Sequence, residues 1–245
     1  MKEEMMQILE NEPIAKNTYE MVLQGDISEI KMPGQFVNLA LPGFFLRRPI
    51  SVCDAAGDRL TLIYKVVGHG TEEMAKLLPG ARLSVLTGLG RGFNTAKSGE
   101  TPLLIGGGVG VPPLYFLCKA LLKKGASVCA VLGFNTAEEV FYAERFRQLG
   151  ARVVLMTADG SAGEKGYVTE ALDGLSYSYF YTCGPMPMYR ALHKVIKGQG
   201  EFSFVERMGC GFGACMGCSC QTKNGSKRIC REGPVLESEE ILWND

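Results

Sequence analysis

Five cysteines near the end of the chain have the type and spacing of metal ligands. Four of them lie in residues 208–220, the glycine-rich stretch MGCGFGACMGCSC, and the fifth is Cys230. Cys210, Cys215 and Cys218 follow a C-x4-C-x2-C pattern, which is how the plant-type [2Fe–2S] motif begins, with a fourth thiolate further along the chain. The intervening glycines allow the backbone to turn around a cluster and direct amides at its sulfurs. We therefore expect Cys210, Cys215, Cys218 and Cys230 to hold a [2Fe–2S] cluster.

Zinc is the main alternative for these thiolates, and a disulfide knot is a weaker one. Structural zinc modules usually show two C-x2-C pairs, whereas this segment has one. We expect the fifth cysteine, Cys220, to pack as a bystander, and its use as an alternate ligand stays open. Nearby cations would moderate the negative charge of a cluster; they are Lys223, Lys227, Arg228 and Arg231.

Two motifs in the middle of the chain could bind a nucleotide. Residues 105–113, IGGGVGVPP, carry Gly106, Gly107, Gly108 and Gly110 between a predicted strand and a predicted helix. Such a turn lets backbone N–H groups approach a diphosphate at the helix N-terminus, although glycine turns also occur for steric reasons alone. Residues 183–185, Cys-Gly-Pro, end the last predicted strand, where ligands of doubly wound sheets bind. We expect Cys183 to expose its thiol there, although a simple proline-terminated turn is an equal alternative.

The first part of the chain carries two further candidate anion sites. Residues 47–52, RRPISV, place two arginines and a serine on one predicted strand, and an arginine fork suits a pyrophosphate. Residues 63–71, IYKVVGHGT, end in a Gly-Thr pair that opens a short predicted helix. Taken singly, each of these segments is more often a solvated strand or a helix cap.

Composition excludes several classes of protein. The 245 residues carry 26 basic and 26 acidic side chains, so the net charge is zero and no nucleic-acid partner is indicated. The acidic N-terminus does not resemble a signal peptide. The uncharged residues 102–118 are too short and too rich in glycine and proline for a membrane span. We expect a cytoplasmic protein without membrane contact, in which clustered cysteines bind metal.

The elements that would position these residues fall into three segments. In residues 1–100, short β-branched and aromatic runs predict an antiparallel β-barrel with strands over 18–25, 34–41, 47–55, 58–68 and 81–88, and a helix over 70–80. In residues 101–200, strands alternate with helices, which predicts an α/β doubly wound parallel sheet. Its strands are expected over 102–108, 127–134, 151–158 and 177–184, and its helices over 112–125, 137–150, 167–175 and 187–200. Residues 201–245 are too poor in apolar residues to form a core without a metal, which predicts a small C-terminal [2Fe–2S] domain.

The ordered set of motifs resembles the ferredoxin-reductase superfamily over nearly the whole chain. Its members bind FAD on a β-barrel and a nicotinamide nucleotide on the following α/β domain. The resemblance implies that Arg48, Pro49, Ile50 and Ser51 hold the flavin and its diphosphate. It further implies that Ile63, Tyr64 and Lys65 line the isoalloxazine and ribityl chain, that Gly70 and Thr71 cap the diphosphate, and that Gly106 to Gly110 and Cys183, Gly184 and Pro185 bound the nicotinamide pocket.

The cysteine segment looks similar to the electron-transfer subunits of NAD-dependent dihydroorotate dehydrogenase. That resemblance implies FAD, [2Fe–2S] and NAD as cofactors, and a heterotetramer of two plus two with an FMN-containing catalytic subunit that oxidises dihydroorotate in pyrimidine (UMP) biosynthesis. Electrons would pass from FMN through the cluster and FAD to NAD+. Asn135 stands where relatives often have a basic residue, which favours NAD over NADP. Two alternatives stay open: a reductase subunit of a ferredoxin:NADP transhydrogenase or a sulfhydrogenase, and a non-enzymatic zinc or redox-sensing module.

Overall fold

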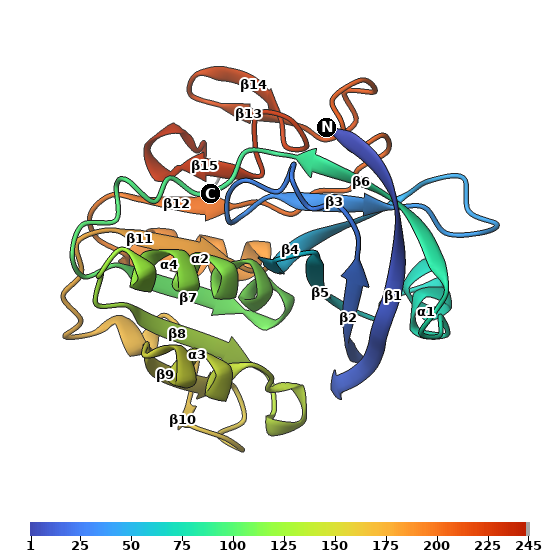
Figure 1. Ribbon diagram of the computed structural model, residues 1–245. Helices are drawn as coiled ribbons and strands as arrows, with labels where there is room; N and C mark the ends of the chain where they lie inside the picture. Colours follow the sequence, from blue (N-terminus) through green and yellow to red (C-terminus); the bar gives the residue numbers. More distant parts are fainter. Residues whose placement is uncertain (244–245) are drawn as a thin grey trace.

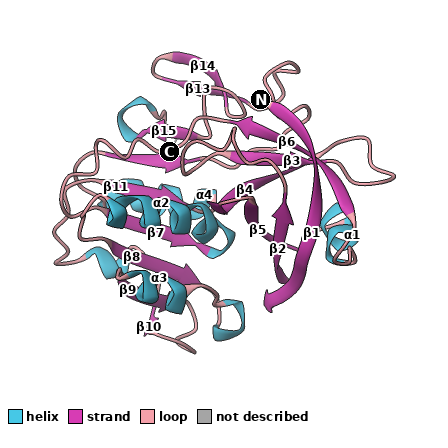
Figure 2. Cartoon of the chain, in the orientation of Figure 1, coloured by secondary structure: helices cyan, strands magenta, loops and turns pink. Residues whose placement is uncertain are grey.

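A computed structural model describes residues 1–243 of the chain (Figures 1 and 2). The strands are β1 (Lys2–Ala15), β2 (Thr18–Gln24), β3 (Phe36–Leu39), β4 (Arg48–Ala56), β5 (Arg59–Lys65), β6 (Arg82–Leu89), β7 (Leu103–Gly107), β8 (Cys129–Phe134), β9 (Arg152–Thr157), β10 (Glu164–Lys165), β11 (Phe180–Cys183), β12 (Gly200–Ser203), β13 (Ser219–Thr222), β14 (Gly225–Arg228) and β15 (Val235–Glu237). The α-helices are α1 (His69–Ala75), α2 (Val111–Lys123), α3 (Ala143–Leu149) and α4 (Met186–Val195).

The first six strands form a closed antiparallel barrel in the order β1-β2-β5-β4-β3-β6. Alternate residues point inward, as the two-residue period of a strand requires. On β3, for example, Val37 and Leu39 lie in the barrel core. The sequence predicted five of these strands and the short helix α1. It missed β1, which pairs with both β2 and β6 and closes the barrel.

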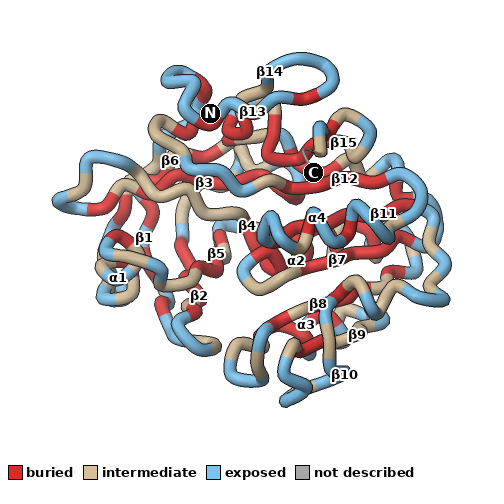
Figure 3. Tube along the Cα trace, turned by 180° about the vertical axis from the view of Figure 1, so that it is seen from behind, coloured by how far each residue is buried: buried red, intermediate tan, exposed pale blue. Residues whose placement is uncertain are grey.

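The second sheet has seven strands in the order β10-β9-β8-β7-β11-β12-β15. The first six strands in this order, β10, β9, β8, β7, β11 and β12, all pair in parallel, as predicted for a doubly wound sheet. Successive residues of β7 enter different cores: Leu104 packs with α2 and α3, whereas Leu103 and Ile105 pack with α4. Both faces of the sheet are therefore covered by helices, and its central strands β7, β8, β11 and β12 are mostly buried, whereas the edge strand β10 is exposed (Figure 3).

Three predicted helices of this region are wrong in whole or in part, and the one over 187–200 is too long, since α4 ends at Val195 and β12 begins at Gly200. The predicted helix over 137–150 divides into a 3₁₀ turn, Ala137–Glu139, and α3, because Val140 is extended and Tyr142 has a left-handed φ of 64°. This break turns the rings of Phe141 and Tyr142 into the core. The predicted helix over 167–175 is only the 3₁₀ turn Glu170–Leu172. Val168 is buried there, and Ala171, Leu172 and Leu175 pack partly buried against the same core, so these apolar side chains reach the core from a turn instead of a helix.

The last part of the chain is joined to both preceding parts. β13 and β14 form a hairpin, while β15 pairs antiparallel with β12 and extends the large sheet. Figure 1 shows this segment, in orange and red, returning over strands β3 and β6 of the barrel. No helix within residues 1–243 is long and apolar enough to cross a membrane.

Candidate functional site

The barrel brings Arg48 of β4 against the turn that opens α1. A Cβ atom at Gly70 would lie 2.1 Å from Nε of Arg48, so glycine lets the guanidinium rest directly on the backbone. The guanidinium also lies 4.7 Å from the ring centroid of Phe44 and donates to the Leu46 carbonyl at 2.6 Å. Arg48 and Gly70, which the sequence assigned to one diphosphate, are thus in direct contact. This cradle, with a half-buried cation above bare backbone, fits an anionic group.

Thr71 uses its hydroxyl to hold the same turn. Its Oγ1 accepts hydrogen bonds from the backbone N–H groups of Val67, at 2.9 Å, and Gly68, at 3.2 Å. The hydroxyl also donates to the Gly68 carbonyl. The Thr71 side chain therefore shapes the helix entry, and contact with a ligand would come from the backbone around it.

The three predicted flavin-lining residues of β5 divide between the two faces of the strand: Tyr64 points into the barrel, and Ile63 and Lys65 point toward the nucleotide domain. Tyr64 lies inside the barrel, 3% exposed, where its hydroxyl donates to Asn11 at 2.8 Å. Its ring therefore cannot line a cofactor, and the expectation that its side chain does so is wrong; alternation with the buried Leu62 would have revealed this orientation. Ile63 packs instead toward the nucleotide domain, in the core that contains α2. The Lys65 amine pairs with Glu139, which follows β8, at 2.9 Å.

The two predicted nucleotide motifs meet at the carboxyl ends of β7 and β11. Cys183 and Gly106 are register partners, and a Cβ at Gly110 would lie 2.1 Å from the Cys183 carbonyl oxygen. Gly107 and Gly184 both press against Met188 of α4. By contrast, Gly108 has a φ of 52° and nothing within 4 Å of a Cβ position. The turn is therefore packed on its protein side and open on the other, which fits a diphosphate approaching its backbone.

Cys183 does not expose a thiol, contrary to the expectation from the sequence. The residue is 1% exposed, and burial raises the pKa of its thiol to about 12. Pro185, two residues further on, is exposed, so the open part of this motif is its proline turn. A neutral, buried thiol serves as packing rather than as a nucleophile.

The four predicted cluster ligands fall into two hydrogen-bonded pairs. The Cys215 N–H donates to Sγ of Cys210 at 3.4 Å, and the Cys210 N–H donates to Sγ of Cys215 at 3.5 Å. The Cys230 N–H donates to Sγ of Cys218 at 3.4 Å. The first pair is partly open, with Cys215 exposed, and the second pair is buried.

Backbone amides also prepare the first pair for ionisation. Burial opposes ionisation of Cys210, but N–H groups of Cys215, Phe212 and Ala214 outweigh it and lower the pKa of this thiol to about 6. A thiolate is the form that binds metal. Among residues 1–243, no three His, Cys, Asp or Glu side chains converge on one point as ligands of a single ion. Two thiol pairs fit a two-iron cluster, in which each iron takes two protein sulfurs.

Other residues of this segment have defined places. Cys220 is half-buried and packs against the core that contains Cys218 and Cys230. The guanidinium of Arg228 pairs with Glu232 and donates to the Gly213 carbonyl at 2.8 Å, so this cation lies on the cysteine loop. Lys227 instead forms an ion pair with Glu240. Of these two cations, Arg228 is therefore the one positioned to moderate charge at the cysteines.

Ion pairs join the barrel to the nucleotide domain, and no sequence motif signalled them. Besides the pair between Lys65 and Glu139, Asp54 of β4 binds Lys119 of α2. Glu20 of β2 accepts hydrogen bonds from the Tyr142 hydroxyl and from Arg145, at 2.8 Å for the arginine. The Asp54–Lys119 pair fixes β4 against α2, the helix that follows the glycine turn, and the other contacts fix β2 and β5 against residues 139–145.

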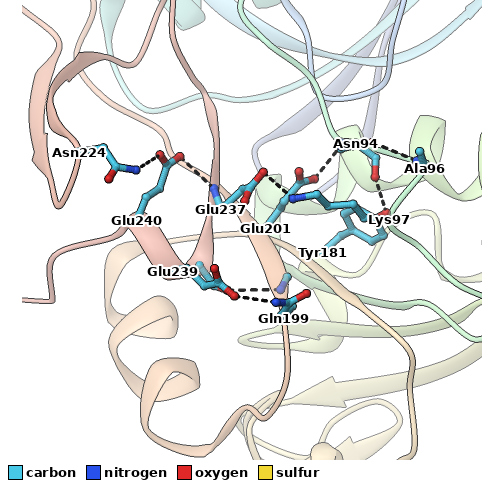
Figure 4. Close-up of polar contacts among 12 residues, drawn as sticks. Asn94, Ala96, Lys97, Tyr181, Gln199, Glu201, Asn224, Glu237, Glu239 and Glu240 are labelled. Atoms are coloured by element: carbon cyan, nitrogen blue, oxygen red, sulfur yellow. Dashed lines mark hydrogen bonds and ion pairs between the residues drawn. The ribbon is translucent and has the colours of Figure 1, made fainter.

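A second polar network ties the cysteine segment to the large sheet (Figure 4). Lys97 binds Glu237 of β15 at 2.7 Å, and Gln199 donates to Glu239 at 2.7 Å. Glu201 of β12 lies opposite Glu237 and accepts from the Asn94 N–H at 2.9 Å. Burial raises the pKa of Glu201.

Comparisons with known proteins agree with this geometry. Residues 206–242 match a model for the iron–sulfur cluster binding domain of dihydroorotate dehydrogenase B, and residues 104–194 match an oxidoreductase NAD-binding domain. The NADH-dependent reduced ferredoxin–NADP oxidoreductase structure is similar, with a TM-score of 0.88 and 27% identity over 98% of this chain and 90% of the other. A cytochrome P450 reductase from Amycolatopsis shares the fold, with a TM-score of 0.69 over 79% of this chain and 65% of the other, at 23% identity.

Two relatives that match over their full length have higher sequence identity to this chain. The chain is 43% identical to the dihydroorotate dehydrogenase B (NAD(+)) electron transfer subunit of Geobacillus sp. (strain WCH70), over 99% of both chains. It is 42% identical to the corresponding subunit of Bacillus mycoides (strain KBAB4), again over 99% of both. The predicted cofactors FAD, [2Fe–2S] and NAD are confirmed by these matches together with the flavin-reductase fold. The chain belongs to the family of electron transfer subunits of NAD-dependent dihydroorotate dehydrogenase B.

Proposed function

We propose that this chain carries electrons from an FMN-containing catalytic partner, which oxidises dihydroorotate, to NAD+ in the cytoplasm, within an assembly of two copies of each subunit. The relatives' name, electron transfer subunit, supports a catalytic partner. In such a chain the cluster carries single electrons, the flavin exchanges one electron or two, and nicotinamide takes a hydride. The residues proposed as cluster ligands are Cys210, Cys215, Cys218 and Cys230.

The observation that carries this proposal is the place of the cysteine loop. It is held on the barrel beside the strand pair that contains Arg48 and Pro49, yet its outer side is open to solvent. Cys215 is exposed, and the apolar side chains of Phe212 and Met216 are 43% and 56% exposed. A redox centre here would have the flavin domain on one side and a partner's surface on the other.

The remaining site residues have distinct proposed tasks. Arg48 neutralises the flavin diphosphate above Gly70, while Pro49, Ile50 and Ser51 present the strand beside it. The backbone of residues 63–65 borders the flavin, and that of residues 106–110, with Gly184 and Pro185, borders the nicotinamide nucleotide. Cys183, buried and protonated, supports that turn from behind.

Reconstitution with a partner tests the proposal. The purified chain, mixed anaerobically with an FMN-containing dihydroorotate dehydrogenase catalytic subunit from a related family member, should form a complex of two plus two by analytical ultracentrifugation. The complex should reduce NAD+ with dihydroorotate, whereas neither protein alone should. A stable complex that reduces other acceptors with dihydroorotate but never NAD+ would refute the proposed direction of electron flow.

A further inference from the structure

Asn38 on β3 connects the barrel to the loop that begins the cysteine motif. The residue is 1% exposed, and its Nδ2 donates to the carbonyl oxygen of Cys210 at 3.1 Å. The same nitrogen lies 2.4 Å from the position that a Cβ atom would occupy at Gly211. Within residues 1–243, this is the only hydrogen bond from a barrel side chain to residues 208–217. Because 172 positions separate Asn38 from Cys210, only the tertiary fold brings them together.

The direction of Asn38 follows from the alternation of β3. Val37 and Leu39 point into the barrel core, so Phe36 and Asn38 face outward. Phe36 packs in the apolar cluster that also contains the two buried cysteines of the motif. The outer face of β3 is therefore the surface on which the cysteine segment rests.

The same strand also borders the flavin motif. Asn38 is the register partner of Pro49 on β4, and residues directly opposite in an antiparallel pair share a face of the sheet. One side chain thus contacts the backbone of the first proposed cluster ligand and lies beside a strand proposed to hold the flavin.

The second polar atom of Asn38 indicates that an amide is required here. Oδ1 is buried and has no hydrogen-bond partner among the described residues. An unpaired buried acceptor is unfavourable, and a leucine of similar size would pack without that penalty. The amide is explained if its N–H bond to Cys210 serves the site rather than the stability of the barrel.

We propose that Asn38 is a positioning residue that fixes the Cys210–Gly211 backbone, and with it the first cluster ligand, on the flavin-bearing face of the barrel. The inference rests on the proposed assignment of Cys210 as a ligand. Gly211 has a φ of 77° and no room for a Cβ, so the loop approaches the amide through bare backbone. Without the amide, the loop keeps its cysteines but loses its fixed attachment to the barrel.

The test is Asn38→Leu in the anaerobically purified holoprotein. Loss of one hydrogen bond should speed the release of iron to a chelator by roughly three- to tenfold. It should also alter the electron paramagnetic resonance spectrum of the reduced cluster and slow cluster reduction by NADH. Gly211→Ala disturbs the same contact from the loop side and should change the spectrum too, which keeps the proposal testable should Asn38→Leu fold poorly.

Asn11→Leu is the matched control. Asn11 is a second buried barrel asparagine, whose Nδ2 donates to the carbonyls of Met74, at 2.8 Å, and Leu77, at 2.9 Å, away from the cysteines. This variant should lower the melting temperature and leave the spectrum and the iron-release rate unchanged. The proposal is overturned if Asn38→Leu and Gly211→Ala behave as wild type, or if Asn11→Leu changes the cluster equally. Full iron content in a Cys210→Ser variant would instead overturn the ligand assignment.

Discussion

Two glycines of the nucleotide turn are needed for different reasons. Gly110 leaves space that a side chain would fill, and Gly108 adopts a backbone conformation that favours glycine. Gly110 has ordinary right-handed helical angles, with φ −81°, but a Cβ there would lie 2.1 Å from the Cys183 carbonyl oxygen. Relieving that overlap requires the turn and β11 to separate by about 1.3 Å, since ordinary contacts begin at 3.4 Å. Gly108 is the reverse case, with free space at its Cβ position but a left-handed φ of 52°. Gly110→Ala should therefore displace the site, and Gly108→Ala should mainly strain the backbone.

The expected magnitudes differ accordingly. A displacement of about 1 Å at a reacting centre can cost on the order of 100-fold in rate, so Gly110→Ala should lower kcat/KM for NADH with ferricyanide by about that factor. Gly108→Ala should cost about 1–2 kcal/mol of folding free energy and lower the melting temperature by roughly 2–8 °C. Steady-state kinetics and thermal unfolding, with FAD content measured in both variants, distinguish them. The reasoning is refuted if Gly110→Ala keeps wild-type kcat/KM, or if Gly108→Ala is the more damaging variant kinetically.

Five further variants, two of them controls, test the other sites. Cys215→Ser should remove iron but leave FAD bound, whereas Cys220→Ser should keep its iron by elemental analysis; loss of iron from both would show that the ligand set is wrong. Arg48→Met should weaken FAD binding by about 10- to 100-fold in a fluorescence titration, because a charge-assisted contact is lost. Its control, Arg47→Met, should retain FAD, since Arg47 binds Glu3; equal affinities would contradict the assignment. Because the pKa of buried Glu201 is raised, the folded state resists its ionisation and loses stability as pH rises above 4.5 through that pKa. Glu201→Gln should therefore melt higher than wild type at pH 8 and equally at low pH; a lower melting temperature at pH 8 would refute this sign.

Local patterns were sufficient for most of the fold. Apolar runs bounded by glycine and proline predicted five barrel strands and the central strands of the parallel sheet, because the barrel strands carry an alternating apolar pattern and the sheet strands a nearly continuous one. β1 escaped because its alternation is sparse: only Met6 and Ile8 supply core side chains, among many charged residues. The helix predicted over 167–175 failed for a different reason, since its apolar residues do pack against the core, but from the 3₁₀ turn Glu170–Leu172.

Motif spacing identified the residues of the sites but not their orientation. The glycine turn and the Cys-Gly-Pro motif do meet, and Arg48 does contact Gly70. Whether a side chain points toward a site or into a core depends on strand register, which is how Tyr64 came to be misassigned. The ion pair of Lys65 with Glu139 and the hydrogen bond of Asn38 with Cys210 join residues far apart in sequence, and no local pattern encodes such contacts.

The order of segments along the chain differs from their order in space, and this difference bears on electron transfer. The cysteine segment follows the nucleotide domain, yet it returns to the barrel, where the Arg91 N–H donates to the Gly233 carbonyl and Asn38 binds Cys210. Its strand β15 is paired with β12, so it is fixed to both earlier parts. A cluster held by this segment would lie beside the flavin domain rather than beyond the nucleotide sheet. Electrons could then reach the flavin without crossing that sheet, which leaves the carboxyl ends of β7 and β11 free to bind the nicotinamide nucleotide.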